Sequence, residues 1–176
     1  PITDPGCEAL LTALEASGVS IPLWDGILIE ETVRIAPGAT ILPGCVLRGN
    51  TTIAAGSVIG PGSVLTDAVI GKNCIVKNTY ITESTLEENV SIGPFSQVRP
   101  GCHIAAGCKI GDFVEVKNSH IGQKTAIAHL TYVGDTDCGS GVNFGCGVAI
   151  ANFNGMEKFR TTIGDGAFLG CNTNLV

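Results

Sequence analysis

Large aliphatic residues recur at every sixth position along most of this chain, and this spacing restricts the possible folds more than any other feature. The first run comprises Ile29, Ile35, Ile41, Leu47, Ile53, Ile59 and Leu65, and the second comprises Ile92, Val98, Ile104, Ile110 and Val116. A period of six fits neither an α-helix, which repeats every 3.6 residues, nor one continuous strand, which repeats every two. It fits short strands joined by tight turns, in which every sixth side chain points inward.

Three such hexads close one triangular coil of about 18 residues, and stacked coils form a solenoid with neighbouring strands about 4.8 Å apart. The interior of so narrow a prism accepts one large aliphatic residue and one small residue per hexad. An aromatic content of only 5% and a count of 24 glycines agree with this interior. The sequence therefore predicts an all-β fold, a parallel β-helix of about eight coils over residues 27–176.

Residues 1–26 do not follow the six-residue pattern and predict a short helix and a linker. Asp4 is a suitable N-cap, Pro5 suits the first helical turn, and Gly18 suits the position after the helix ends. We expect the helix over residues 4–17 and the linker to run through Trp24.

A second irregularity lies near the end of the chain, where 13 residues separate Ile150 from Ile163 although six would continue the repeat. The excess predicts an external loop at 151–162, with the sequence ANFNGMEKFRTT and two cations, Lys158 and Arg160. Loops on rigid scaffolds often carry function. A harmless insertion is the alternative.

Charge and cysteine content exclude several classes of protein. The net charge of −6 argues against a nucleic-acid-binding protein. All of that surplus lies in residues 1–88, so an anion-binding site is expected in the second half. The eight cysteines form no CxxC pair, which argues against a zinc site. Without a signal peptide or an apolar run of membrane-spanning length, we expect a reduced, cytoplasmic protein with buried thiols and no membrane partner.

Two cations are predicted to stack on neighbouring coils. Val98 and Val116 are 18 residues apart, so Arg99 and Lys117 occupy equivalent places. Cations about 4.8 Å apart repel each other unless an anion lies between or beside them. The external loop leaves the prism just after Ile150, which lies two coils further along the same stack of residues, and this loop contains Lys158. These three residues predict a phosphate-binding site, and solvated surface cations are the alternative.

One histidine is a candidate catalytic base because of the residues on which it is predicted to stack. His129 follows Ile127 by two residues, and the coil length places it between Asp112 and Cys146 on adjacent coils. A neutral imidazole can accept a proton from an amine near neutral pH. An ordinary surface histidine is the alternative. His103 and His120 lie next to turns, and we expect them to be solvent-exposed and without a role.

From about residue 20 onward the chain resembles a known family. The segments that carry the resemblance are IGPFSQVRPG (92–101), GDFVEVKNSHIG (111–122), AHLTYVGD (128–135), GSGVNFGCGVAIANFNG (139–155) and KFRTTIGDGAFLGCNT (158–173). They resemble the acetyltransferase domain of the bifunctional bacterial N-acetylglucosamine-1-phosphate uridyltransferase/glucosamine-1-phosphate acetyltransferase family. The resemblance implies that the parallel β-helix is left-handed. It also implies a homotrimer with active sites between subunits.

The resemblance also implies roles for ten residues. His129 matches the general base. The residues that match the sugar-phosphate site are Arg99, Lys117, Tyr132, Asn143 and Lys158, the last reaching a neighbouring subunit's substrate. The residues at acetyl-CoA positions are Cys146, Asn152, Phe153 and Cys171. Three of these depart from the family, because Phe153 replaces Tyr, Cys146 replaces Ala and Cys171 replaces Ser.

The function expected from the resemblance is acetyl transfer from acetyl-CoA to the 2-amino group of glucosamine-1-phosphate, giving N-acetylglucosamine-1-phosphate for UDP-N-acetylglucosamine synthesis. No metal is expected in this domain, and no uridyltransferase activity, since nothing in the chain resembles that domain. Two alternatives stay open. One is an acyltransferase for another amino sugar or nucleotide sugar, and the other is a non-catalytic, trimerising β-helix.

Overall fold

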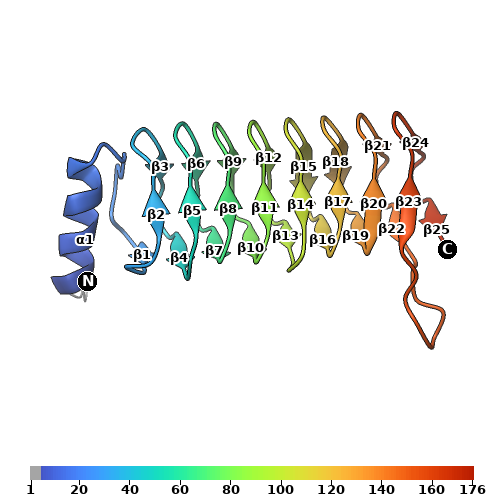
Figure 1. Ribbon diagram of the computed structural model, residues 1–176, viewed down its shortest axis with the longest axis horizontal. Coiled ribbons are helices and arrows are strands. Elements are labelled where there is room, and N and C mark those ends of the chain that lie inside the picture. Colours follow the sequence, from blue (N-terminus) through green and yellow to red (C-terminus); the bar gives the residue numbers. More distant parts are fainter. Residues whose placement is uncertain (1–4) are drawn as a thin grey trace.

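The computed structural model describes residues 5–176 as one helix followed by a long three-sided prism (Figure 1). Helix α1 (Pro5–Ala16) precedes 25 short strands, each two to four residues long. The strands form three parallel sheets, and consecutive strands always lie in different sheets. The chain is therefore a parallel β-helix, as the six-residue pattern predicts, and it has the left-handed form that the family resemblance implies.

We call the three sheets face I, face II and face III, in the order in which the chain visits them. Face I contains β1 (Leu28–Ile29), β4 (Val46–Arg48), β7 (Val64–Thr66), β10 (Tyr80–Thr82), β13 (Gln97–Val98), β16 (Glu115–Lys117), β19 (Tyr132–Gly134), β22 (Ala149–Ile150) and β25 (Asn174–Leu175). Face II contains β2 (Arg34–Ile35), β5 (Thr52–Ile53), β8 (Val69–Ile70), β11 (Thr85–Leu86), β14 (His103–Ile104), β17 (His120–Ile121), β20 (Thr136–Cys138) and β23 (Thr161–Ile163). Face III contains β3 (Thr40–Ile41), β6 (Val58–Ile59), β9 (Ile75–Val76), β12 (Ser91–Ile92), β15 (Lys109–Asp112), β18 (Ala126–His129), β21 (Asn143–Phe144) and β24 (Phe168–Leu169).

The aliphatic anchors fill the interior of the prism. Ile41, Leu47, Ile59 and Leu65 have no exposed surface, and the anchors of later coils are buried in the same way. Small side chains complete each hexad, and buried hydroxyls such as that of Ser57 bond to backbone atoms of neighbouring turns. This regular interior fixes the register of the coils, so residues 17 or 18 apart stack on one another.

Cysteines occupy several of the small positions, but the expectation that the thiols are buried is only partly met. Five of them lie in the interior, namely Cys45, Cys74, Cys102, Cys108 and Cys138. Cys146 is half-buried and Cys171 is exposed, because both lie in turns at a corner of the prism. All seven of these thiols are unpaired.

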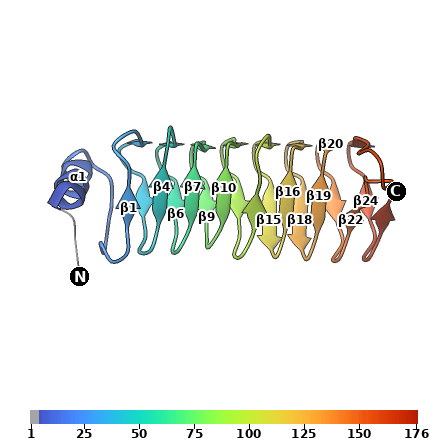
Figure 2. The same cartoon turned by 90° about the horizontal axis from the view of Figure 1, so that it is seen from below.

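Helix α1 lies across the N-terminal end of the prism (Figures 1 and 2). Its Leu11 is buried, and so are Val19 and Ile21 in the following segment. Ser20 already pairs with Thr40, so the predicted linker contains the first contacts of the solenoid. The proposed cap Asp4 lies outside the described residues. Within those residues, no helix is long and apolar enough to cross a membrane.

Near the C-terminal end a loop leaves the prism between β22 and β23, where Figure 1 shows it projecting from the body. Phe153 and Lys158 pair across the loop. Arg160 holds the base of the loop in place. Its guanidinium donates to both carboxylate oxygens of Asp137, at 2.5 and 2.7 Å. It also donates to the carbonyl of Asn118 at 3.0 Å. The loop is therefore anchored at the corner between faces I and II.

Candidate functional site

The predicted site residues gather mainly along the two corners that bound face I. His129 ends β18 at the corner between faces III and I, whereas Lys117 ends β16 at the corner between faces I and II. Five residues of chain lead from His129 to Gly134, the neighbour of Lys117 in the ladder. Because the chain turns at Leu130, the two ends lie closer together than the roughly 16 Å that five extended residues would span. Side chains reaching inward from both corners can therefore contact one molecule the size of a sugar phosphate.

His129 is held by a carboxylate from the coil below. Asp112 and His129 are ladder partners, and the Nδ1 atom of His129 lies 2.8 Å from Oδ1 of Asp112. This hydrogen bond lowers the pKa of Asp112, so the carboxylate is ionised at neutral pH and accepts the Nδ1 proton. The Nε2 atom of the neutral ring is then left as the proton acceptor, and the ring is 58% exposed and accessible to a substrate.

Lys117 is paired with a buried carboxylate at the opposite corner. Its Nζ atom donates to Asp135 at 3.1 Å from Oδ2, and the side chain of Asp135 is only 12% exposed. Burial alone would raise the pKa of Asp135. Hydrogen bonds from Asn118, Lys117 and Asn152 outweigh burial and lower the pKa to about 2. The hydrogen bond to Asp135 in turn raises the pKa of Lys117, so this lysine carries its charge at neutral pH.

Two amides complete the surroundings of Asp135. Asn118 donates to Oδ1 at 2.6 Å, and Asn152 donates to Oδ2 at 2.8 Å. Asn152 is buried and also bonds to the carbonyl of Gly134. Its side-chain amide is therefore directed toward Asp135, and the cofactor contact that the resemblance implies stays a prediction.

Arg99 stacks below Lys117, as the coil length predicts, but it too has a carboxylate partner. Its Nη1 donates to Oε1 of Glu115 at 2.8 Å, and this bond raises the pKa of Arg99. The anions beside the stacked cations are thus supplied by the protein itself. Both pairs leave part of the cation in solvent, since the side chains of Arg99 and Lys117 are 43% and 20% exposed.

The loop places Lys158 beside this cluster. The Lys117 ammonium lowers the pKa of Lys158, and Arg99 acts in the same direction from further away. The structure therefore brings together the three cations that the sequence singles out. They gather at the loop corner of this chain, and the role of Lys158 toward a neighbouring subunit's substrate stays a prediction.

Tyr132 lies on face I between the two corners. Its ring covers Gly134, where a Cβ atom would come 2.3 Å from the phenolic oxygen. Gly134 is buried and provides the space for this ring. Asn143, by contrast, begins β21 on face III, stacked on Ala126 and away from the cations. The structure does not bring Asn143 into contact with Tyr132.

The four residues at acetyl-CoA positions divide between the corners. Cys146 and Cys171 continue the column of Asp112 and His129, because the amide of Gly147 bonds to His129 and that of Asn172 bonds to Cys146. Asn152 and the 58% exposed Phe153 lie instead at the loop corner.

Sequence reasoning missed Asn118, Glu115 and Asp135, the polar partners of the cations. One signal was available, since Asn118, Asp135 and Asn152 are spaced by 17 residues and therefore stack. Of the other two histidines, His120 is solvent-exposed as predicted, whereas His103 is not fully exposed. His103 is half-buried and lies 2.9 Å from Glu87, while the exposed His120 lies 3.2 Å from Asp137.

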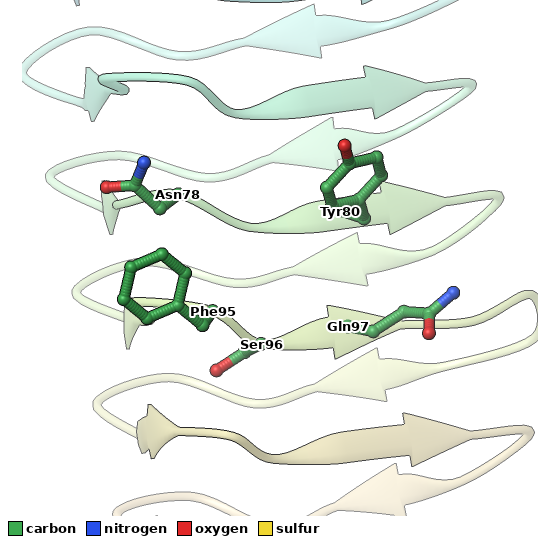
Figure 3. A pocket seen from close by; sticks show the side chains of 5 residues that line it. All are labelled: Asn78, Tyr80, Phe95, Ser96 and Gln97. Carbon is green, nitrogen blue, oxygen red and sulfur yellow. The ribbon is translucent and has the colours of Figure 1, made fainter.

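A shallow hollow of about 420 Å³ lies further toward the N-terminus on face I. It is lined by Asn78, Tyr80, Phe95, Ser96 and Gln97, and Figure 3 shows Tyr80 and Gln97 on neighbouring strands. The exposed ring of Phe95 stacks on Phe113 at 5.6 Å between centroids. The hollow is uncharged and contains none of the predicted site residues.

The comparisons with known proteins agree with the repeat and the fold. Residues 32–67 and 83–118 match the family model described as bacterial transferase hexapeptide (six repeats). The bifunctional protein GlmU of Brevibacillus brevis is 55% identical over 91 residues, which are 52% of this chain and 20% of that protein. GlmU of Clostridium kluyveri is 56% identical over 89 residues, covering 51% and 20%. The chain thus matches about a fifth of the length of these curated relatives.

Solved structures share the solenoid at low sequence identity. A crystal structure of UDP-N-acetylglucosamine acyltransferase superposes with a TM-score of 0.64 at 18% identity, covering 75% of this chain and 62% of that one. An Arabidopsis UDP-N-acetylglucosamine acyltransferase gives a TM-score of 0.54 at 17% identity, covering 85% and 62%. The chain thus contains the repeats of the bacterial transferase hexapeptide model, is similar to GlmU over half its length, and shares its fold with these acyltransferases.

Proposed function

We propose that the protein transfers an acetyl group from acetyl-CoA to the 2-amino group of glucosamine-1-phosphate across face I. The observation that carries this proposal is the orientation of His129 by Asp112, at 2.8 Å, on the same face as a cluster of three cations. A base for the amine and positive charge for a phosphate are the two features that this substrate requires. The similarity to GlmU over half the chain supports the same reaction.

The chemistry assigned to His129 is general-base catalysis. The ammonium group of the sugar loses one proton to solvent before it can react. As the neutral amine attacks the acetyl carbonyl, Nε2 of His129 takes the second proton, and CoA leaves as its thiolate. Asp112 stabilises the imidazolium that forms and keeps the ring in the required tautomer. Such catalysis typically contributes 10²–10⁴-fold.

The cation cluster is assigned to the phosphate. Lys117 and Arg99 are already oriented by Asp135 and Glu115, so little side-chain entropy is lost when an anion arrives. Lys158, on the loop, adds a third positive charge. A phosphate held here would place the sugar over Tyr132, with its amino group directed toward His129.

The acetyl-CoA contacts are assigned to both corners. Cys146 and Cys171, which have small side chains, continue the His129 column, and we place the thioester along this column. Phe153, exposed on the loop, supplies an apolar surface for the coenzyme, and Asn152 acts by fixing Asp135. Asn143 contacts the sugar only if the substrate extends around the corner onto face III.

A homotrimer is the assembly proposed for this chain. Phe95, Phe113 and Leu130 stack on successive coils at the His129 corner, each more than half exposed. An apolar strip of this kind is typical of a protein–protein interface. A second copy packed here would enclose the site next to His129. The unpaired thiols fit the cytoplasm, the compartment that we propose.

The test is release of free thiol from acetyl-CoA with glucosamine-1-phosphate as acceptor. His129→Ala should lower kcat by 100-fold or more, the scale of a lost general base, with little change in stability because the ring is exposed. His103→Ala, at a histidine paired with a different carboxylate, is the matched control and should keep full activity. Equal activity of wild type and His129→Ala would refute the role of the base. A fully inactive wild type would favour a non-catalytic β-helix, and activity only on a nucleotide sugar would favour the other acyltransferase.

A further inference from the structure

Two of the cysteines differ from the others in a way that the proposed reaction does not use. Burial raises the pKa of the thiols of Cys45, Cys74, Cys102, Cys108 and Cys138, in the last case to about 11. These five are therefore protonated and shielded from reagents at neutral pH. Among the cysteine side chains that the structure describes, only Cys146 and Cys171 reach solvent.

These two accessible cysteines are also neighbours. Phe144 pairs with Leu169, so Cys146 and Cys171, each two residues further on, occupy equivalent turns of adjacent coils. The amide of Asn172 donates to the carbonyl of Cys146 at 2.8 Å, which holds the two turns together. Adjacent strands lie about 4.8 Å apart, within the range of roughly 4.4–6.8 Å that disulfides span between Cα atoms.

We infer that Cys146 and Cys171 are a reversible dithiol/disulfide pair, a site of thiol oxidation above His129. The reaction is thiol–disulfide exchange with a small disulfide such as oxidised glutathione. One cysteine thiolate attacks the reagent, forms a mixed disulfide and releases one glutathione thiolate. The second cysteine thiolate then attacks the mixed disulfide, forms the Cys146–Cys171 bond and releases the second glutathione. The two cysteines are oxidised and one disulfide of the reagent is reduced.

The position of the pair makes the bond reversible. Stacked residues in a parallel ladder keep their Cβ atoms about as far apart as the strands, slightly more than the 3.5–4.5 Å that a relaxed disulfide prefers. Closing the bond therefore requires one turn to shift. Both cysteines lie in turns at a corner of the prism, outside the strand ladders. A strained, exposed disulfide is readily reduced again.

The bond would also change the surface beside His129. Cys146 stacks directly on His129, and Cys171 lies one coil further on. If acetyl-CoA approaches along this column, which rests on the proposed function, the disulfide alters its binding surface. Oxidation would then switch off acetyl transfer, and reduction would restore it.

The experiment uses the whole chain carrying Cys7→Ser, because the side chain of Cys7 lies outside the described structure. The protein is equilibrated with defined ratios of reduced and oxidised glutathione, alkylated, and analysed by intact mass spectrometry and peptide mapping. We expect the loss of two alkylatable thiols, with Cys146 and Cys171 joined. Cys146→Ala or Cys171→Ala should instead stop at the mixed glutathione disulfide, whereas Cys108→Ala, at a buried thiol, should still form the bond.

Two results would overturn the inference. One is a parent protein that accumulates mixed disulfides at Cys146 and Cys171 without joining them. The other is a bond that forms no more readily in the folded protein than in urea. These readouts do not depend on enzymatic activity, so they hold even if no acetyl transfer is found.

A second measurement tests the link to the coenzyme. Saturating acetyl-CoA should slow oxidation of the pair by about tenfold, and the oxidised protein should lose at least tenfold in acetyl transfer until a reductant is added. Cys108→Ala, at a buried thiol outside the proposed site, should lose and regain activity in the same way as the parent. An oxidised protein with undiminished activity would refute the switch.

Discussion

The ammonium of Lys117 lies 3.1 Å from the carboxylate of Asp135, and only 12% of the Asp135 side chain is exposed. This ion pair changes how the stacked cations Arg99 and Lys117 are interpreted. Stacked cations without partners would destabilise the empty protein, whereas here the carboxylates of Asp135 and Glu115 neutralise them. An incoming phosphate therefore meets cations that are oriented in advance.

Asp135 gives a stability prediction with a defined sign. Its pKa is lowered from 3.8 to about 2 in the folded protein, so the ionised carboxylate stabilises the fold above about pH 4. That contribution, about 2 kcal/mol by linkage, is lost as the pH falls from about 4 to 2. Asp135→Asn should therefore lower the free energy of unfolding at pH 7 by this amount, and the two proteins should converge near pH 2.

Urea unfolding of both proteins at several pH values measures the difference. Asp25→Asn, at an exposed position on the first coil, is the control and should match wild type throughout. A difference that stayed constant from pH 7 to pH 2 would show that the charge of Asp135 is not its source.

The fold was largely predictable from the sequence, but the cation partners were not. One inward side chain per hexad follows from the six-residue spacing of large aliphatic residues such as Ile41 and Leu47, which are fully buried. Asp135 also adopts a left-handed backbone conformation, with φ of 50°, which the repeat spacing does not specify. The coil length stacks Asn118, Asp135 and Asn152 in one column, but it does not determine which way their side chains turn.

Asp112 gives a prediction about His129. Asp112→Asn keeps an acceptor for the Nδ1 proton but removes the charge that stabilises the imidazolium, so kcat should fall 10–100-fold with little change in KM. The reciprocal measurement needs no substrate. Since the hydrogen bond to His129 lowers the pKa of Asp112, His129→Ala should raise that pKa, as followed by carboxyl carbon NMR. An unchanged Asp112 titration would contradict the pairing.

The apolar strip gives a prediction about assembly. Sedimentation equilibrium of the parent should give three times the chain mass of 18.0 kDa. Phe113→Glu places a charge within the strip and should weaken association by about 30-fold or more, as expected at an interface hot spot. Phe168→Glu, on a residue that is 75% exposed and belongs to face III, is the control and should leave the trimer intact. A parent that is monomeric at every concentration would refute the interface.

The central claim is that one substrate spans face I, with its amine at His129 and its phosphate at Lys117 and Lys158. The most direct measurement compares kcat/KM for glucosamine-1-phosphate and for glucosamine, in wild type, Lys117→Met, Lys158→Met and the distant control Lys72→Met. Wild type and the control should prefer the phosphorylated sugar. Each of the two site variants should lose 10–100-fold on that substrate, the value of one charge-assisted contact, and less than twofold on glucosamine. Equal losses on both substrates, or a wild type without preference for the phosphate, would contradict the account.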